Sequence, residues 1–259
     1  MKKFVKLFAL AIMLILGVQT MAQNKIRGTM FLGASFPMKD YADFDGFDDF
    51  ALTSDDDEAG AEIGFNAGLK WNFNVGVEGL GVMLSIDGFY NGPCSELKTA
   101  YHKDEGSSVV LDGFIGESFS YKATPKYINI PAMLGMNYMF RVNSQLAFYA
   151  EAGAGGNLRF ITEKESVAKG KLLNMETTVK DTQNYDKAFS FAYQAGVGVE
   201  VAKRLVIGCS FYDLGKAEVC GEQTIKRTVN NGDTNTTTNY NTYGTIHPIM
   251  ILGRIGFSF

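Results

Sequence analysis

Eight segments of the chain alternate between apolar and polar residues with a period of two. In the last of them, one side carries Ile249, Ile251, Ile255, Phe257 and Phe259, and mostly smaller or polar residues lie between them. This period is typical of a β-strand with one apolar and one polar face. The alternation predicts strands over residues 26–36, 63–73, 80–91, 127–140, 146–160, 189–201, 205–212 and 249–259.

The apolar faces of these strands carry no charged residue. All the strand charges fall on the opposite faces, and they are Arg27, Lys70, Asp87, Glu151, Arg159, Glu200 and Arg254. A lipid-facing wall would require this separation, because a Lys or Arg at mid-depth costs about 2–4 kcal/mol. A soluble antiparallel sheet alternates in the same way, with its apolar face in a protein core. Alternation therefore leaves both interpretations open.

The lengths of the connections separate these two interpretations. Three links are short, over 74–79, 141–145 and 202–204, and four are long, over 37–62, 92–126, 161–187 and 215–245. Short and long links alternate along the whole chain, as the periplasmic turns and exterior loops of outer-membrane barrels do. The sequence therefore predicts an all-β fold, an eight-stranded antiparallel up-and-down transmembrane β-barrel with both ends on the periplasmic side.

The first residues have the pattern of a secretion signal. Lysines precede an apolar run over 7–18, and Ala22 supplies a small residue at a cleavage point. The apolar run is too short to span a bilayer as a helix. We expect a signal peptide over 1–22 and a barrel domain over 23–259, located in the cell outer membrane.

Three stretches resemble a known family, the Bacteroidetes outer-membrane β-barrel proteins, which include PorT-like barrels of the porin family. They are Ala22-Gln23, Tyr127-Ile128-Asn129-Ile130-Pro131 and Gly256-Phe257-Ser258-Phe259. The resemblance implies a fold and a place in the cell envelope, and it carries over no catalytic residue.

The same resemblance implies an assembly signal at Phe257 and Phe259, which the barrel-assembly machinery reads. The implied surroundings are outer-membrane lipids and lipopolysaccharide. Pro131 lacks a backbone N–H, so we expect a bulge or a strand end there.

Eight strands enclose an interior just wide enough for side chains to fill. The predicted lumen holds four positive and three negative side chains, and buried charges persist when they are paired. We therefore expect a plug of ion pairs in place of an open pore.

Little in the chain points to catalysis or a cofactor. His102 and His247 have no nucleophile motif around them, so no enzymatic activity is expected. The first exterior loop is acidic, and Asp43, Asp45, Asp48 and Asp49 are a weak calcium-site candidate. This run lacks the full spacing and the closing Glu of an EF-hand, so a solvated acidic loop is the preferred interpretation.

The remaining features bound the role of the protein. The net charge of −4 argues against a nucleic-acid partner. A disulfide between Cys94 and Cys220 is left open, and the Thr/Asn-rich run 234–241 is expected to be mobile.

We expect a structural or surface-interaction role through the long exterior loops, with an envelope or extracellular partner that the sequence does not name. The alternatives are a narrow channel for small or apolar solutes and an accessory barrel of a secretion system.

Overall fold

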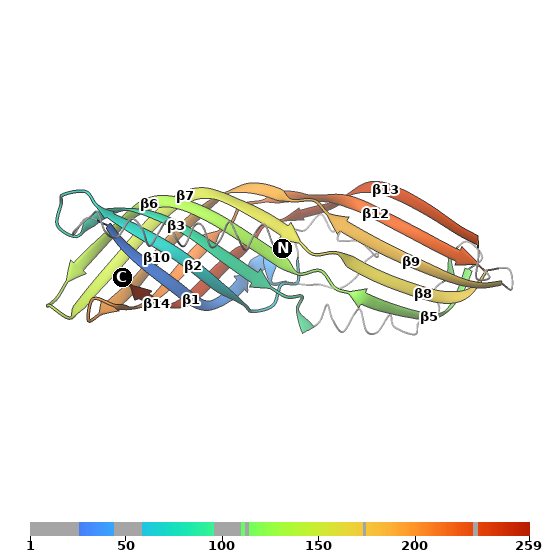
Figure 1. The fold of residues 1–259 in the computed structure, drawn as a ribbon, viewed down its shortest axis with the longest axis horizontal. Coiled ribbons are helices and arrows are strands. Elements are labelled where there is room, and N and C mark those ends of the chain that lie inside the picture. Colours follow the sequence, from blue (N-terminus) through green and yellow to red (C-terminus); the bar gives the residue numbers. More distant parts are fainter. Residues whose placement is uncertain (1–25, 44–58, 96–109, 112–113, 173–174, 230–232) are drawn as a thin grey trace.

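The structure is a computed structural model, and it describes residues 26–43, 59–95, 110–111, 114–172, 175–229 and 233–259. Eight antiparallel strands close into a barrel in the order β1-β14-β11-β10-β7-β6-β3-β2 (Figure 1). These strands are β1 (Ile26–Met38), β2 (Gly64–Asn74), β3 (Leu80–Asn91), β6 (Tyr127–Arg141), β7 (Leu146–Ile161), β10 (Ala188–Val201), β11 (Leu205–Asp213) and β14 (Ile249–Ser258). Each predicted strand ends within two residues of an observed one, and the predicted fold class is confirmed.

The apolar faces of the barrel strands point outward. Leu134, at the centre of β6, is 62% exposed, and Phe191 and Ile255 lie on the outer face in the same way. The charged side is turned inward, where Arg254 is only 3% exposed. The alternative of a sheet with its apolar side in a protein core is therefore wrong for this chain. Among the described residues, no helix has the length and apolar character needed to cross a membrane.

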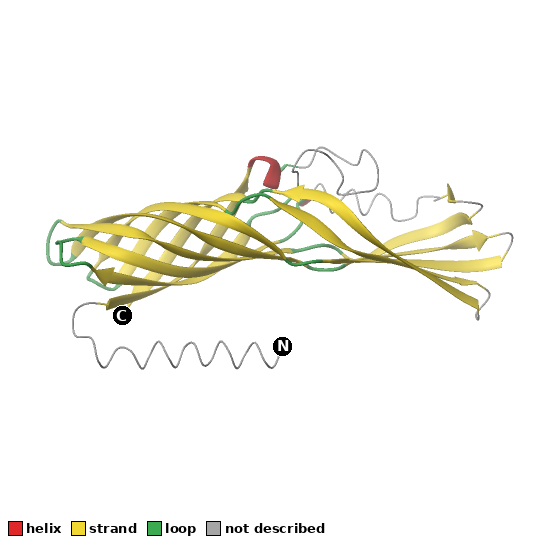
Figure 2. Cartoon of the chain, turned by 90° about the horizontal axis from the view of Figure 1, so that it is seen from above, coloured by secondary structure: helices red, strands yellow, loops and turns green. Residues whose placement is uncertain are grey.

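The barrel continues at one end into a second sheet (Figures 1 and 2). This projecting sheet has six strands in the order β13-β12-β9-β8-β5-β4. They are β4 (Val110–Leu111), β5 (Phe114–Ala123), β8 (Lys164–Leu172), β9 (Met175–Tyr185), β12 (Ala217–Val229) and β13 (Asp233–Ile246). Three of the four links that were predicted as exterior loops therefore contribute strands.

Residues 234–241, which the sequence predicted to be mobile, lie in β13, and each of them pairs with a residue of β12. Their mobility stays a prediction. Threonine is β-branched and suits a strand. Both faces of this strand are polar, so it shows no alternation.

The prediction of a bulge or strand end at Pro131 is also wrong. β6 pairs with β7 without a register shift, and Pro131 lies opposite Asn157. On the other side of β6, the pairing with β3 skips Asp87 and Gly88, and the register is the same before and after the gap. The missing N–H therefore interrupts one ladder locally and leaves the strand intact.

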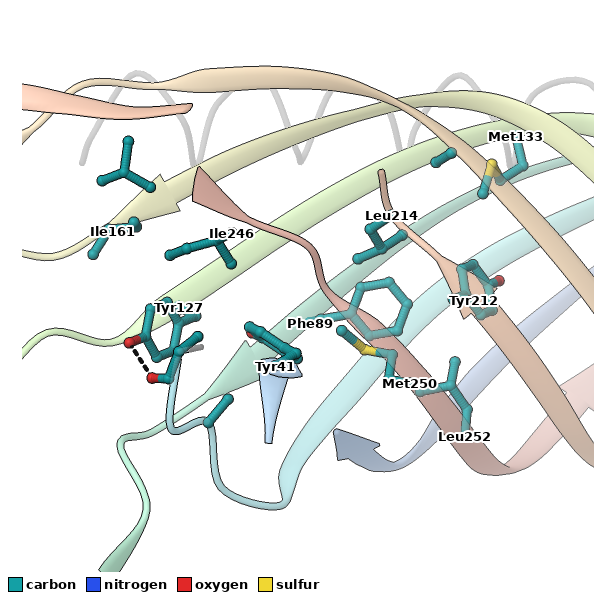
Figure 3. Packing of buried hydrophobic residues seen from close by; sticks show 14 of the residues in the cluster. Tyr41, Phe89, Tyr127, Met133, Ile161, Tyr212, Leu214, Ile246, Met250 and Leu252 are labelled. Atoms are coloured by element: carbon teal, nitrogen blue, oxygen red, sulfur yellow. Dashed lines mark hydrogen bonds between the residues drawn. The ribbon is translucent and has the colours of Figure 1, made fainter. Parts of the chain in front are cut away.

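A cluster of buried apolar side chains fills the barrel at the end that carries the projecting sheet (Figure 3). Tyr41 lies in a short 3-10 turn, η1 (Lys39–Tyr41), and its ring meets that of Tyr127 edge-on at 5.7 Å. The Tyr127 hydroxyl donates to the carbonyl of Ala59 at 2.6 Å, and Phe89 packs edge-on against Tyr212. This cluster closes the exterior end of the lumen.

Candidate functional site

Arg254 of β14 lies at the centre of a network of buried polar groups inside the barrel. Its guanidinium pairs with Asp87 of β3 at 3.1 Å and with Glu151 of β7 at 3.3 Å. It also donates to the hydroxyls of Ser210 at 2.6 Å and Tyr212 at 3.3 Å. The Tyr212 hydroxyl in turn donates to Asp87 at 2.9 Å. The network thus joins β3, β7, β11 and β14 across the lumen.

Lys70 of β2 extends this network. Its ammonium donates to Glu151 at 2.5 Å and lies 4.7 Å from the centroid of the Phe31 ring and 4.6 Å from that of Tyr149. The Arg254 guanidinium lies 4.8 Å from the same Phe31 centroid. Such cation–π contacts gain strength in a desolvated site. Lys70 and Arg254 balance the charges of Asp87 and Glu151, so the middle of the lumen is neutral.

The other two predicted lumen cations lie nearer the barrel ends. Arg27 forms an ion pair with Glu200 and donates to the carbonyl of Lys203 at 2.5 Å. Arg159 is 1% exposed, and its hydrogen bonds go to Asn129 at 3.2 Å and to the carbonyls of Ile246 at 2.8 Å and Gly215 at 3.0 Å. Arg159 therefore ties the end of the barrel to the base of the projecting sheet and forms no part of the central charge network.

In the described part of the chain, the lumen opens at the end with the short turns. A vestibule of about 630 Å³ lies there, and Arg27 and Asn137 are among its lining residues. Beyond it is a recess of about 10 Å³ lined by Lys70, Tyr149 and Glu200. This volume is enough for about one water molecule, so the space inside the barrel is much narrower here than in the vestibule.

The projecting sheet has two different edges. On one side, the edge strand β13 has fourteen residues, pairs with β12 and has no second partner strand among the described residues, and residues 234–240 are all exposed. On the other side, the described part of β4 has two residues and pairs only with Phe114 and Ile115, so residues 116–123 of β5 have no second partner strand among the described residues. The hydroxyl of Tyr240 donates to Asp186 at 2.5 Å, and this hydrogen bond raises the pKa of Tyr240 to about 12. The tyrosine on the long edge therefore stays neutral at any physiological pH.

The remaining predicted site residues are dispersed. Phe257 and Phe259 lie at the end of β14 with their rings on the outer side, and their role in assembly stays a prediction. Of the calcium candidates, Asp45, Asp48 and Asp49 lie outside the described residues, while Asp43 follows η1. Within the described ranges, no three His, Cys, Asp or Glu side chains lie close enough to hold a metal ion.

The signal peptide and His102 also lie outside the described residues. His247 lies between β13 and β14, and its Nε2 is 2.7 Å from Oδ1 of Asp213. The structure contains no disulfide between Cys94 and Cys220, the bridge that the sequence left open, and Cys209 is not bridged either.

Some residues that contribute to the contacts inside the lumen were not predicted from the sequence. The partners Tyr212 and Ser210 lie on the polar side of β11, and this strand shows only a short alternation. Phe31 and Tyr149 are large aromatic residues that lie on the polar sides of their strands. Because the same polar faces carry the charged residues of the strands, the positions of Phe31 and Tyr149 could have predicted cation–π contacts.

No protein-family profile matches the chain, and no curated protein matches it. Among solved structures, Ail of Yersinia pestis in complex with the heparin analogue sucrose octasulfate is similar, with 15% identity, a TM-score of 0.35, and coverage of 91% of this chain and 99% of Ail. A major outer membrane protein of Thermus thermophilus has 9% identity, a TM-score of 0.39, and coverage of 90% of this chain and 99% of its own.

These similarities are low, and the finer resemblance to PorT-like barrels stays a prediction. The strand order, the closure, the outward apolar face and the division into short turns and long hairpins all belong to the outer-membrane class. On this evidence the chain is an eight-stranded outer-membrane β-barrel.

Proposed function

We propose that the barrel is a closed membrane anchor that holds the projecting sheet at the cell surface, where the sheet binds other proteins. The observation that carries this proposal is the long free edge of β13. Extended segments can add a strand to such an edge, with main-chain hydrogen bonds supplying the affinity. The proposal assigns the protein no enzymatic activity and no cofactor.

The edge lacks the usual devices that block strand addition. Natural edge strands carry Lys, Pro or bulges, or are very short. β13 has no Lys and no Pro, its only charged residue is Asp233, and its one pairing irregularity lies opposite Glu218 and Cys220 near the barrel. The opposite edge is formed mostly by β5, because β4 covers only Phe114 and Ile115 of that strand. β5 carries the exposed Lys122 and two register shifts, which are devices that hinder strand addition. The difference between the two edges supports β13 as the binding edge.

The same proposal treats the lumen as a plug. The charges of Lys70, Asp87, Glu151 and Arg254 are paired with one another, and the apolar cluster around Tyr41 and Tyr127 fills the exterior end. Both features oppose the alternative of a narrow channel.

Purified protein in planar bilayers is therefore expected to show no steady conductance, because no water-filled path crosses the network around Arg254. A large-pore barrel reconstituted under the same conditions is the positive control. A steady, reproducible conductance from this protein would support the channel alternative in its place.

Photo-crosslinking in whole cells tests the edge. A photoreactive amino acid in place of Tyr240, which is 67% exposed, is expected to give discrete protein adducts at the cell surface. Thr234→Lys together with Thr238→Lys should abolish these adducts, because lysines on an edge strand block the approach of another strand.

The control places the same charges on an interior strand. Thr178 and Thr182 lie on β9, which is separated from β13 by β12. They pair with the same two β12 residues that pair with Thr234 and Thr238 on the other side. Thr178→Lys with Thr182→Lys should leave the adducts intact. If this control pair abolishes them equally, the sheet face is the binding surface and the edge proposal is wrong.

A further inference from the structure

The vestibule at the turn end of the barrel is a sizeable cavity, and the proposed surface role does not use it. Its volume of about 630 Å³ lies in the range of small-molecule sites, about 300–1,000 Å³. Its walls come from the ends of several barrel strands and from short turns, so they belong to the rigid part of the molecule.

The vestibule has an excess of positive charge. Its lining includes Arg27, Arg141, Lys203 and Arg204 against one acidic residue, Glu78. Glu200 neutralises Arg27. The other three cations have no ion-pair partner among the described residues, and two of them lie in the turn between β10 and β11. An anion that enters this cavity would meet several unpaired cations at once.

The turn that presents these two cations is held in a strained conformation. Ala202 has φ 53° and Lys203 has φ 60°, values that residues with a Cβ rarely adopt. Hydrogen bonds to three other segments of the chain fix the turn. Arg27 donates to the carbonyl of Lys203, the N–H of Ala202 donates to Gln145 at 2.6 Å, and the N–H of Ser258 donates to Arg204 at 2.7 Å. The backbone positions from which the Lys203 and Arg204 side chains extend are therefore fixed before a ligand binds.

Two amide oxygens in the wall lack hydrogen-bond donors. Asn137 is only 6% exposed, and its Oδ1 has no partner within the described chain. Oδ1 of Asn72, which lines the same vestibule, is also buried without a partner there. A buried acceptor without a donor costs about 1–3 kcal/mol. A ligand that carries hydroxyl groups would remove this cost, whereas a bare anion would not.

We propose that the vestibule binds a phosphate ester that also carries hydroxyl groups, such as a phosphoglycerol group. The phosphoryl oxygens accept hydrogen bonds from Lys203, Arg204 and Arg141, since guanidinium and ammonium groups are the preferred phosphate donors. The hydroxyls donate to Asn137 and Asn72. This chemistry occurs in soluble glycerol phosphates and in the headgroups of anionic phospholipids.

The test uses the full-length mature protein in phosphatidylcholine nanodiscs, with sn-glycerol 3-phosphate as the probe and NMR as the readout. The side-chain amide of Asn137 and the backbone amide of Lys203 are expected to shift saturably. Lys203→Gln with Arg204→Gln should weaken the affinity at least tenfold. Lys180→Gln with Lys226→Gln, which removes the same charge from the projecting sheet, should leave it unchanged.

Methyl phosphate tests the hydroxyl requirement. It should bind about tenfold more weakly than glycerol phosphate to the native protein, and Asn137→Val should remove this difference. If that variant does not fold, the comparison of the two double variants still decides the proposal.

A second set of nanodiscs, with phosphatidylglycerol and no soluble probe, identifies the source. Shifts at Asn137 in these discs support a lipid headgroup, whereas shifts with the soluble probe alone support a soluble ester. Absence of saturable shifts in both arms, or equal affinities in the two double variants, would overturn the proposal. Neither result bears on the binding edge at β13.

Discussion

Arg254→Met is expected to lower the free energy of unfolding of the barrel by about 3–5 kcal/mol, because it leaves two buried carboxylates short of one positive charge. Asp87 and Glu151 both pair with Arg254 at present, and only Lys70 would remain to balance them. Denaturant titration in detergent micelles measures this, with the fluorescence of Trp71 as the signal. It is the single tryptophan of the chain.

Arg141→Met is the matched control, since Arg141 is exposed at the end of β6. Exposed substitutions usually change stability by about 0.5 kcal/mol or less. Adding Asp87→Asn to Arg254→Met should recover part of the loss, since it removes one of the unpaired carboxylates. Equal losses of unfolding free energy in Arg254→Met and Arg141→Met would show that the ion pairs of Arg254 with Asp87 and Glu151 do not stabilise the barrel.

Leu134→Arg is expected to destabilise the barrel in a bilayer by about 2–4 kcal/mol, the cost of a cation on the lipid face at mid-depth. Leu134 lies at the centre of β6 and points outward, level with Leu84 and Ala154 of the neighbouring strands. Unfolding in phospholipid vesicles, followed by the mobility of folded and unfolded protein in gels, measures this loss.

The depth of the substitution provides the control. Ile63 is also 62% exposed, but it precedes β2 at the exterior end of the barrel. Near the interface the cost of a cation falls to about 0–1 kcal/mol, so Ile63→Arg should be almost neutral. If Leu134→Arg and Ile63→Arg lose the same stability, the cost of a cation does not depend on its depth, and the outward face does not lie in the hydrocarbon core of a bilayer.

The barrel could be predicted from the sequence because one of its two environments is apolar and the other polar. Residues such as Leu134 and Ile255 mark the lipid side of each strand, and Lys70 or Arg254 marks the other side. The projecting sheet lacks this contrast. In β13 both faces meet water, so Thr and Asn occur on both sides and no period of two separates them.

The charged residues of the lumen could be predicted, but their partners could not. Lys70 and Glu151 lie on β2 and β7, which are not neighbours in the barrel and are 81 residues apart in the chain. Their contact depends on the register of the intervening strands and on the curvature of the closed sheet. Arg159 shows the same limit, because most of its partners are backbone carbonyls that no residue pattern reveals.

The links between barrel strands and sheet strands have a mechanical consequence. Only residues 162–163 separate β7 from β8, and only 247–248 separate β13 from β14. A partner pulling on β13 would therefore load the barrel along its strands, while the hydrogen bonds of antiparallel pairs run across them. A load on β13 would be shared as shear by many hydrogen bonds at once, so the bonds would not have to break one after another from the end of the sheet.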